Sequence, residues 1–339
     1  MSGRERLALV LVLAGAVAGV GLGFRAETVS ETDRRAEAAA DGLTGGLEAE
    51  TAEALAAGME RLFGQYRQPT LPPGGMPGVA DEDELSSGRS TFAVKCAQCH
   101  GVTGAADTGT ARLLKPRPRS FRSGALKFTS TPAGQPPLRA DLERVIREGI
   151  PTTSMAGFPT LPEKARRELA SYTQYLLMRG ATEAAALAEI EGLGGAAGHS
   201  QVSEIVESAY EAVARAWEQA EAAPVPPPSD DPAVRQDARA EELYRAAACL
   251  TCHGEDGSGK GPVAWANDQW LLRDAWGNEA RPRAFADGVW FGGDAPEDLY
   301  RRIAHGVKGT PMPPSAGSLS PEEIWALVRY VQGFSQEED

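Results

Sequence analysis

The chain has 339 residues, of which 42% are hydrophobic, so it is long enough for two domains with real cores and connecting segments. Its 47 acidic residues outnumber 34 basic residues, and the formal net charge of −13 argues against nucleic-acid binding, which needs a basic footprint. The 38 glycines and 24 prolines indicate many turns and loops.

The N-terminal region contains an uncharged apolar stretch over residues 7–24, preceded by Arg4 and Arg6. As a helix it would be about 27 Å long, close to the ~30 Å hydrocarbon core of a bilayer. A signal peptide with a cleavage site at Ala16-Val17-Ala18 is the alternative, but the apolar run continues past that point and favours an uncleaved anchor over residues 1–25. The arginines predict a cytoplasmic N-terminus and export of everything that follows.

Residues 26–80 are predicted to form a helical stalk and a Pro/Gly linker. The segment from Thr32 to Gln68 is rich in Ala, Glu and Arg, and the run PTLPPGGMPG over residues 69–78 then breaks any helix. We expect this segment to lift the first folded domain away from the membrane.

All four cysteines lie in two identical Cys-x-x-Cys-His frames: Cys96-Ala-Gln-Cys99-His100 and Cys249-Leu-Thr-Cys252-His253. This frame is typical of c-type haem attachment, because two thiols three positions apart can reach the two vinyl groups of one porphyrin. The adjacent imidazole then falls under the iron as its proximal ligand. A redox dithiol or a zinc site is the alternative for one copy, but two copies with the same downstream signals disfavour both.

The two frames head two predicted domains, residues 81–180 and 234–339, joined by a linker over residues 181–233. Within the linker, apolar positions over residues 202–222 follow the period of an amphipathic helix. A run of prolines over residues 224–228 then predicts a stiff extended spacer. We expect the helix to pack on a haem domain rather than on a partner.

The two domains are copies of one pattern. Each begins with a small residue four positions before an aromatic ring, typical of a close helix crossing, and each ends in a helix with an inward aromatic residue; these are Gly88, Phe92 and Tyr172, and then Ala240, Tyr244 and Tyr330. Between them lie the runs Arg117-Pro118-Arg119-Ser120-Phe121 and Arg281-Pro282-Arg283-Ala284-Phe285. Asp141, Gly149 and Met155 then repeat with identical spacing as Asp298, Gly306 and Met312.

Both domains resemble class I cytochromes c, and the whole chain is similar to membrane-anchored dihaem members of that superfamily. The resemblance implies an all-α fold with two tandem cytochrome c domains, an N-terminal transmembrane helix, a helical and Pro-rich inter-domain linker, and two covalently bound haem c groups. It also implies that a methionine following Gly-x-x-x-Thr-x-Met is the sixth ligand of each iron.

The motifs Gly149-Ile-Pro-Thr-Thr153-Ser-Met155 and Gly306-Val-Lys-Gly-Thr310-Pro-Met312 fit that place, and a thioether raises the potential relative to two imidazoles. Met178 on the closing helix, His305 and His199 are the weaker candidates. The resemblance places Arg117, Arg119, Arg281 and Arg283 near the haem propionates. It also assigns to the carbonyl of Pro262 the hydrogen bond that orients the proximal histidine, a device without a counterpart in the first domain.

Two irons each held by His and Met leave no open position for a substrate, so the resemblance predicts an electron carrier rather than an enzyme. A dihaem peroxidase is the alternative. The expected location is the cytoplasmic membrane, with the haem domains on its periplasmic side. The expected partner is a membrane redox complex, whether a quinol-oxidising complex, a terminal oxidase or a molybdenum oxidoreductase. The second domain alone carries Gly-Pro and tryptophans, so the two haems are predicted to differ in potential.

Overall fold

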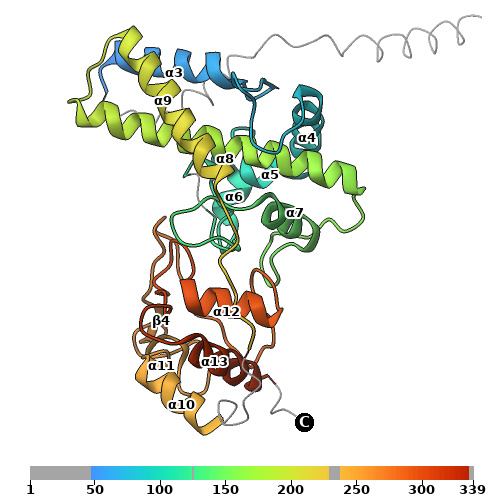
Figure 1. Cartoon of the computed structure of the whole chain (residues 1–339), viewed down its shortest axis with the longest axis vertical. Coiled ribbons are helices and arrows are strands. Elements are labelled where there is room, and N and C mark those ends of the chain that lie inside the picture. Colours follow the sequence, from blue (N-terminus) through green and yellow to red (C-terminus); the bar gives the residue numbers. More distant parts are fainter. Residues whose placement is uncertain (1–46, 124–125, 229–236, 336–339) are drawn as a thin grey trace, which may run out of the picture. The chain divides into compact units, whose positions relative to one another are not determined.

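The computed structural model describes residues 47–123, 126–228 and 237–335, and residues 46–339 form one compact unit (Figure 1). The predicted anchor over residues 1–25 lies outside the described residues. None of the helices in the described ranges combines the length and the apolar composition that a membrane span requires.

The first module, which contains Cys96, is built on two crossing helices. The helices of residues 47–228 are α3 (Ala49–Phe63), α4 (Glu82–Lys95), α5 (Ala97–His100), α6 (Gly109–Leu113), the 3-10 turn η2 (Phe121–Ser123), α7 (Arg139–Glu148), α8 (Glu163–Gly192) and α9 (His199–Glu218). Helix α4 begins at the N-cap Asp81, whose side chain accepts from the Glu84 amide. It crosses α8 at Gly88, where an added Cβ would overlap the backbone of Glu168. The ring of Phe92 packs edge-on against Tyr172, with ring centroids 5.2 Å apart, which confirms the predicted crossing.

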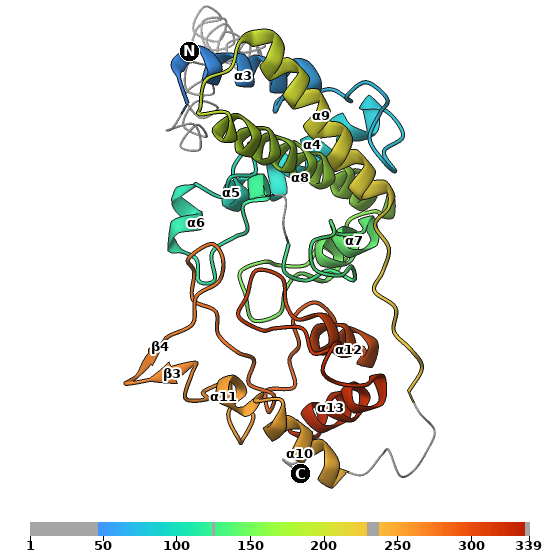
Figure 2. The same cartoon turned by 60° about the vertical axis from the view of Figure 1, so that its left-hand side comes forward.

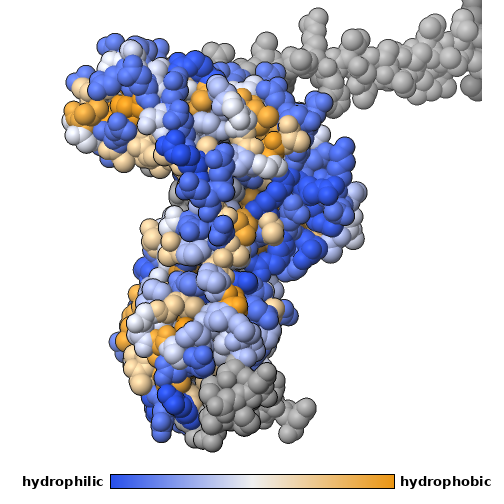
Figure 3. All heavy atoms as spheres, viewed as in Figure 1, coloured by the Kyte–Doolittle hydropathy of each residue, from blue (hydrophilic) through white to orange (hydrophobic). Residues whose placement is uncertain are grey.

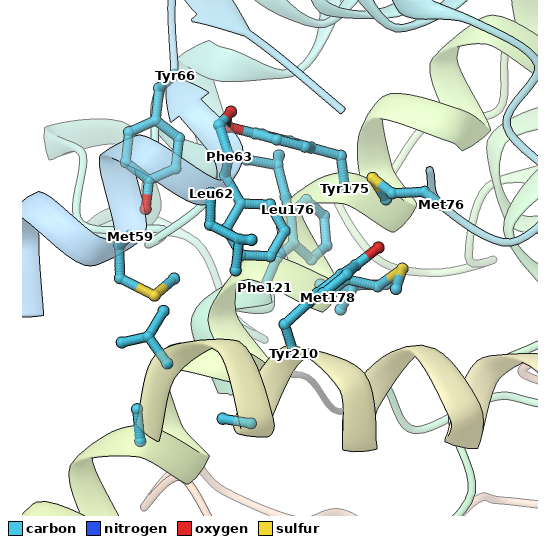
Figure 4. Close-up of a cluster of buried hydrophobic side chains, with 14 of the residues drawn as sticks. Met59, Leu62, Phe63, Tyr66, Met76, Phe121, Tyr175, Leu176, Met178 and Tyr210 are labelled. Atoms are coloured by element: carbon cyan, nitrogen blue, oxygen red, sulfur yellow. Dashed lines mark hydrogen bonds between the residues drawn. The ribbon is translucent and has the colours of Figure 1, made fainter. Parts of the chain in front are cut away.

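Helices α3 and α9 lie against the second half of α8 and share its core (Figure 1). Phe63 of α3 is fully buried and meets Tyr175 of α8 and Tyr210 of α9 at 5.8 Å and 5.5 Å between ring centroids (Figure 4). The hydroxyl of Tyr175 donates to the Phe63 carbonyl at 3.0 Å. The linker helix therefore packs on the first module, as predicted.

The described part of the predicted stalk differs from a free-standing spacer. Its helix α3 buries one apolar face, including Leu55, Met59 and Leu62, because helices α8 and α9 offer a complementary apolar surface. Helix α8 also continues to Gly192, well past the expected domain end at residue 180. Helices α3 and α9 pack against this extended helix.

The second module repeats the arrangement with shorter helices. Its elements are α10 (Asp237–Ala246), α11 (Leu250–His253), β3 (Trp265–Ala266), β4 (Gln269–Trp270), α12 (Pro296–His305) and α13 (Pro321–Gly333). Tyr244 of α10 packs against Tyr330 of α13, with ring centroids 5.4 Å apart, which is the counterpart of the pair Phe92 and Tyr172. Ser320 caps α13 and closes a capping box with Glu323.

The fold is mostly helical, as predicted, but the described residues are not purely α. Two short antiparallel hairpins occur, β1 (Gly64–Gln65) with β2 (Gln68–Pro69), and β3 with β4. In the second, Asn267 and Asp268 both take positive φ angles of 50° and 58°. Such a pair matches the right-handed twist of two flanking strands and so closes a two-residue turn.

An extended segment after α9 leads from the first module past α12 to the second (Figure 2). Its Ala223 amide donates to the Ser130 carbonyl at 2.7 Å, and its Pro226 carbonyl accepts from the Trp325 indole at 2.8 Å. The face seen in Figure 3 is largely hydrophilic with scattered apolar groups, in keeping with the acidic composition.

Candidate haem sites

Each Cys-x-x-Cys-His frame forms one short helical turn, α5 in the first module and α11 in the second. Both turns end at a glycine with positive φ, Gly101 at 75° and Gly254 at 83°, which only glycine adopts without strain. The carbonyls of the two turns are capped differently. The hydroxyl of Thr108 donates to the Gln98 carbonyl at 2.8 Å, whereas the amide of Gly261 donates to the Cys252 carbonyl at 3.0 Å.

The two candidate proximal histidines are oriented in the same way. Nδ1 of His100 lies 3.0 Å from the Arg119 carbonyl oxygen, and Nδ1 of His253 lies 3.3 Å from that of Arg283. A carbonyl only accepts, so Nδ1 carries the proton, and Nε2 keeps the lone pair that a metal takes. This corrects the expected role of Pro262, which is exposed: its segment instead supports the α11 turn, because Gly261 packs directly on it.

A phenylalanine covers one face of each imidazole. Phe121 stacks on His100 with centroids 4.7 Å apart, and Phe285 stacks on His253 at 4.6 Å. Both rings belong to the Arg-Pro-Arg-x-Phe run, whose second arginine supplies the carbonyl acceptor. The repeated run thus supplies a stacking ring and a carbonyl acceptor, whereas the sequence predicts only a role for its guanidinium groups.

Burial sets the protonation of the candidate ligands. It lowers the pKa of both His100 and His253, although the hydrogen bonds to the arginine carbonyls oppose it. Neutral imidazoles are the form that binds metal. Burial also raises the pKa of Cys96 to about 12 and that of Cys249 above its usual value, so these thiols are protonated at neutral pH.

The two methionine loops share one hydrogen-bond pattern. In the first, the Ile150 amide donates to the Met155 carbonyl at 2.9 Å, and the Met155 amide donates to the Thr153 hydroxyl at 3.1 Å. In the second, Val307 donates to Met312 at 3.3 Å and Met312 to Thr310 at 3.3 Å.

Each loop begins at a glycine, Gly149 with φ 72° and Gly306 with φ 69°. A Cβ on either glycine would overlap the carbonyl of its own methionine. Both methionines are half-buried, whereas the competing Met178 is fully buried in the core that α3, α8 and α9 share. The core position of Met178 leaves Met155 as the methionine of a preformed loop in the first module.

The four arginines of the repeated run have different surroundings. Arg117 is exposed and donates to the Ala106 carbonyl, and Arg281 is exposed and pairs with Glu279. Arg119 pairs with the buried Asp274 at 3.3 Å. The fourth, Arg283, pairs with Asp287, but its Nε is buried without a partner.

The backbone carbonyl of Arg283 contacts the candidate ligand His253, and its buried guanidinium N–H has no partner. Such an orphaned donor fits a haem carboxylate, because burying it unpaired is costly. The two cysteines, neutral imidazole and methionine loop of each module complete the donor set of a c-type haem. The residues present therefore fit the group that the sequence predicts.

A family described as cytochrome c oxidase, cbb3-type, subunit III matches residues 83–172 and 235–331, together more than half of the chain. The chain belongs to this family. As a cbb3-type subunit III family member it is a c-type cytochrome that binds covalently attached haem c.

Two relatives add to this. Over 104 residues the chain is 33% identical to the cbb3-type cytochrome c oxidase subunit FixP of Azorhizobium caulinodans, a match that spans 31% of this chain and only 28% of that subunit. A chain of the Kuenenia stuttgartiensis reducing HAO-like protein complex Kustc0457/Kustc0458 is similar in structure, with a TM-score of 0.55 and 28% identity. The structural similarity covers 76% of the present chain and 98% of the Kuenenia stuttgartiensis chain.

Proposed function

We propose that this cytochrome is a dihaem electron carrier in which both irons are held by histidine and methionine. His100 and Met155 would hold the iron in the first module, and His253 and Met312 would hold it in the second. Thioether bonds join one haem to Cys96 and Cys99 and the other to Cys249 and Cys252.

The observation that carries this proposal is that the two methionine loops share one hydrogen-bond pattern. Each is closed by the same backbone and threonine hydrogen bonds, and each begins at a glycine that no other residue replaces without strain. A preformed loop with a soft ligand favours a closed coordination sphere over one that opens for substrate. A dihaem peroxidase needs one iron with an accessible distal side, so we do not favour that function.

The arginine pairs are proposed to bind the haem propionates. Arg283 has the strongest case, since its buried Nε lacks an acceptor. Arg119 has an acidic partner already, so its guanidinium would be shared between Asp274 and a propionate. Arg117 and Arg281 are exposed and would contribute less.

Residues 1–25 are proposed to anchor the chain in the cytoplasmic membrane, with both haem modules on the periplasmic side. The partner is proposed to be a membrane redox complex. Family membership and the likeness to the FixP oxidase subunit favour a terminal oxidase over a quinol-oxidising complex or a molybdenum oxidoreductase.

Absorption of the ferric protein tests the ligand assignment. Methionine-ligated haem c has a far-red sulfur-to-iron band, and two equivalents of it per chain are expected. Met155→His and Met312→His should each remove one equivalent and lower one midpoint potential, because a second imidazole stabilises ferric iron relative to thioether. The control Met178→Leu should keep both bands. A parent protein with one band and one high-spin haem would contradict the proposal.

Purification tests the partner. The full-length tagged chain, isolated from native membranes in mild detergent, is expected to carry subunits of a terminal oxidase and to be oxidised when that complex turns over. Recovery of a quinol-oxidising complex or a molybdenum enzyme instead would overturn the choice of partner without touching the ligand assignment.

A further inference from the structure

One of the contacts between the two haem modules is made by the buried carboxylate of Asp274. Its Oδ1 accepts from the amides of Trp276 at 3.0 Å and Asn278 at 2.9 Å, which fixes the loop between β4 and Arg281. Its Oδ2 accepts from Lys127 at 2.8 Å and Arg119 at 3.3 Å, both from the first module. Because the carboxylate is almost fully buried, this ion pair is screened little by solvent.

The loop also presents Trp276 to the first module. The guanidinium of Arg119 lies over the indole ring, 3.6 Å from its centroid, in a cation–π contact. The carbonyl of the same arginine accepts from Nδ1 of His100. Asp274 and Trp276 of the second module therefore hold the residue that orients the candidate proximal ligand of the first.

Trp276 also contacts the methionine loop of its own module. The indole packs so closely on Gly309 that an added Cβ would overlap its six-membered ring, and the Ala275 amide donates to the Gly309 carbonyl at 2.8 Å. Gly309 lies three residues before Met312.

The first module shows why residue 309 is glycine. The matching position in its loop is Thr152, whose φ of 58° is close to the 67° of Gly309. The first module thus holds a threonine at a similar positive φ, at a cost in backbone strain. Residues 81–180 of the first module contain no tryptophan, so that domain has no counterpart of Trp276 to exclude a side chain at Thr152.

We propose that Trp276 is a positioning residue for both haem sites: it ties the support of His100, through Arg119, to the loop of Met312, through Gly309. The two candidate haem sites are then not independent, because one side chain supports His100 of the first, through Arg119, and the loop of Met312 of the second, through Gly309. This rests on the proposed His/Met ligation and extends it to coupling between the modules.

Redox titration of the holoprotein tests the proposal, with the ferric sulfur-to-iron bands and the electron paramagnetic resonance signal of each haem as further readouts. Trp276→Ala is expected to move both midpoints, changing the ratio of reduced to oxidised haem at a given potential by about threefold at each site. Trp276→Phe should restore part of both shifts. The control Trp265→Ala, which removes a tryptophan of the β3–β4 hairpin that packs on Trp270, should move neither midpoint by as much.

The variant Gly309→Thr gives a second test of the coupling, which does not depend on the folding of Trp276→Ala alone. Gly309→Thr copies the first module and pushes the indole aside, so it should disturb both sites in the presence of Trp276. In the Trp276→Ala background it should add no further shift, since Thr152 shows that this backbone accepts threonine.

Midpoint shifts confined to the second haem, or additive effects of Trp276→Ala and Gly309→Thr, would overturn the coupling. The proposed function is read separately, from the two sulfur-to-iron bands of the parent. A parent without those bands refutes His/Met ligation. The role of Trp276 is still decided by whether Trp276→Ala changes the resonance signals of both haems or of only one.

Discussion

The imidazole of His253 lies against the ring of Phe285, with centroids 4.6 Å apart and planes inclined by 20°. Its counterpart His100 lies on Phe121 at 4.7 Å and 11°. A ring against one face and a carbonyl at Nδ1 together fix the plane of each imidazole before the iron binds. The position of Nε2 is therefore set by the polypeptide, which is the usual way in which a protein orients a metal-binding histidine.

Truncation of Phe285 tests this support. Phe285→Ala removes a side chain that is 6% exposed, so the free energy of unfolding of the holoprotein should fall by about 3–5 kcal/mol, and Phe285→Leu should cost less. Urea denaturation followed at the haem absorption measures both. The control Val94→Ala changes a residue that is 78% exposed and should stay within about 0.5 kcal/mol of the parent. Equal effects of Phe285→Ala and Val94→Ala would contradict a supporting role.

The methionine loops give a second prediction. Gly306→Ala places a Cβ against the Met312 carbonyl at φ 69° and ψ −172°, a backbone conformation essentially restricted to glycine, so we expect a loss of about 1–3 kcal/mol from the backbone conformation alone. Because the loop must shift, the ferric protein should also lose about half of its sulfur-to-iron absorption. Gly317→Ala meets no neighbouring atom and is the matched control. Retention of both bands in Gly306→Ala would show that the loop tolerates the displacement.

The sequence predicts the motifs that occur in both modules, but it does not predict the contacts between the modules. The ligand frames, the Arg-Pro-Arg-x-Phe runs and the methionine loops align between the halves, so each copy supports the interpretation of the other. The partners of Arg119 could not be found in this way, because Asp274 and Trp276 have no counterpart in the first module. A contact between two modules leaves no periodic or local signal in the chain. The acceptor for His253 is the Arg283 carbonyl and not that of Pro262, which the resemblance to class I cytochromes c implied.

The apolar face of α3 was present in the sequence, but its packing was not predictable from spacing. A helix rich in Ala and Glu is equally suited to a stalk, and only the positions of α8 and α9 show that Leu55, Met59 and Phe63 are covered. Local patterns predict elements well, whereas the surface that covers an element depends on the tertiary arrangement.

Phe63→Ala separates the two interpretations of residues 47–63. If α3 belongs to the first module, the loss of this fully buried ring should lower the stability of that module by about 3–5 kcal/mol. A free-standing stalk would leave it unchanged. Thermal unfolding monitored separately at the two haems measures the effect, with the second haem as internal reference. Leu113→Ala, at a residue that is 83% exposed in the same module, is the control.

Lys308 gives a prediction about pH. Its ammonium donates to the Thr131 hydroxyl at 2.7 Å and to the Gln135 carbonyl at 2.8 Å, and burial lowers its pKa to about 8 although Asp141 opposes the shift. In the unfolded chain the pKa is about 10.4. Below pH 8 both states are protonated, and the folded state carries the cost of the buried charge.

Between pH 8 and about pH 10 the unfolded state holds a proton that the folded state has released, so the free energy of unfolding gains a contribution that rises with pH. Lys308→Met removes the buried charge. The free energy of unfolding of this variant minus that of the parent should therefore be highest near pH 7 and should fall as the pH rises above 8. The two lost hydrogen bonds add a constant to this difference and do not change its dependence on pH. Urea denaturation of both proteins at pH 7, 8, 9 and 10 measures the difference. Lys164→Met, at a lysine whose side chain is 83% exposed, is the control, and a Lys308→Met difference that stays constant over this range would refute the lowered pKa.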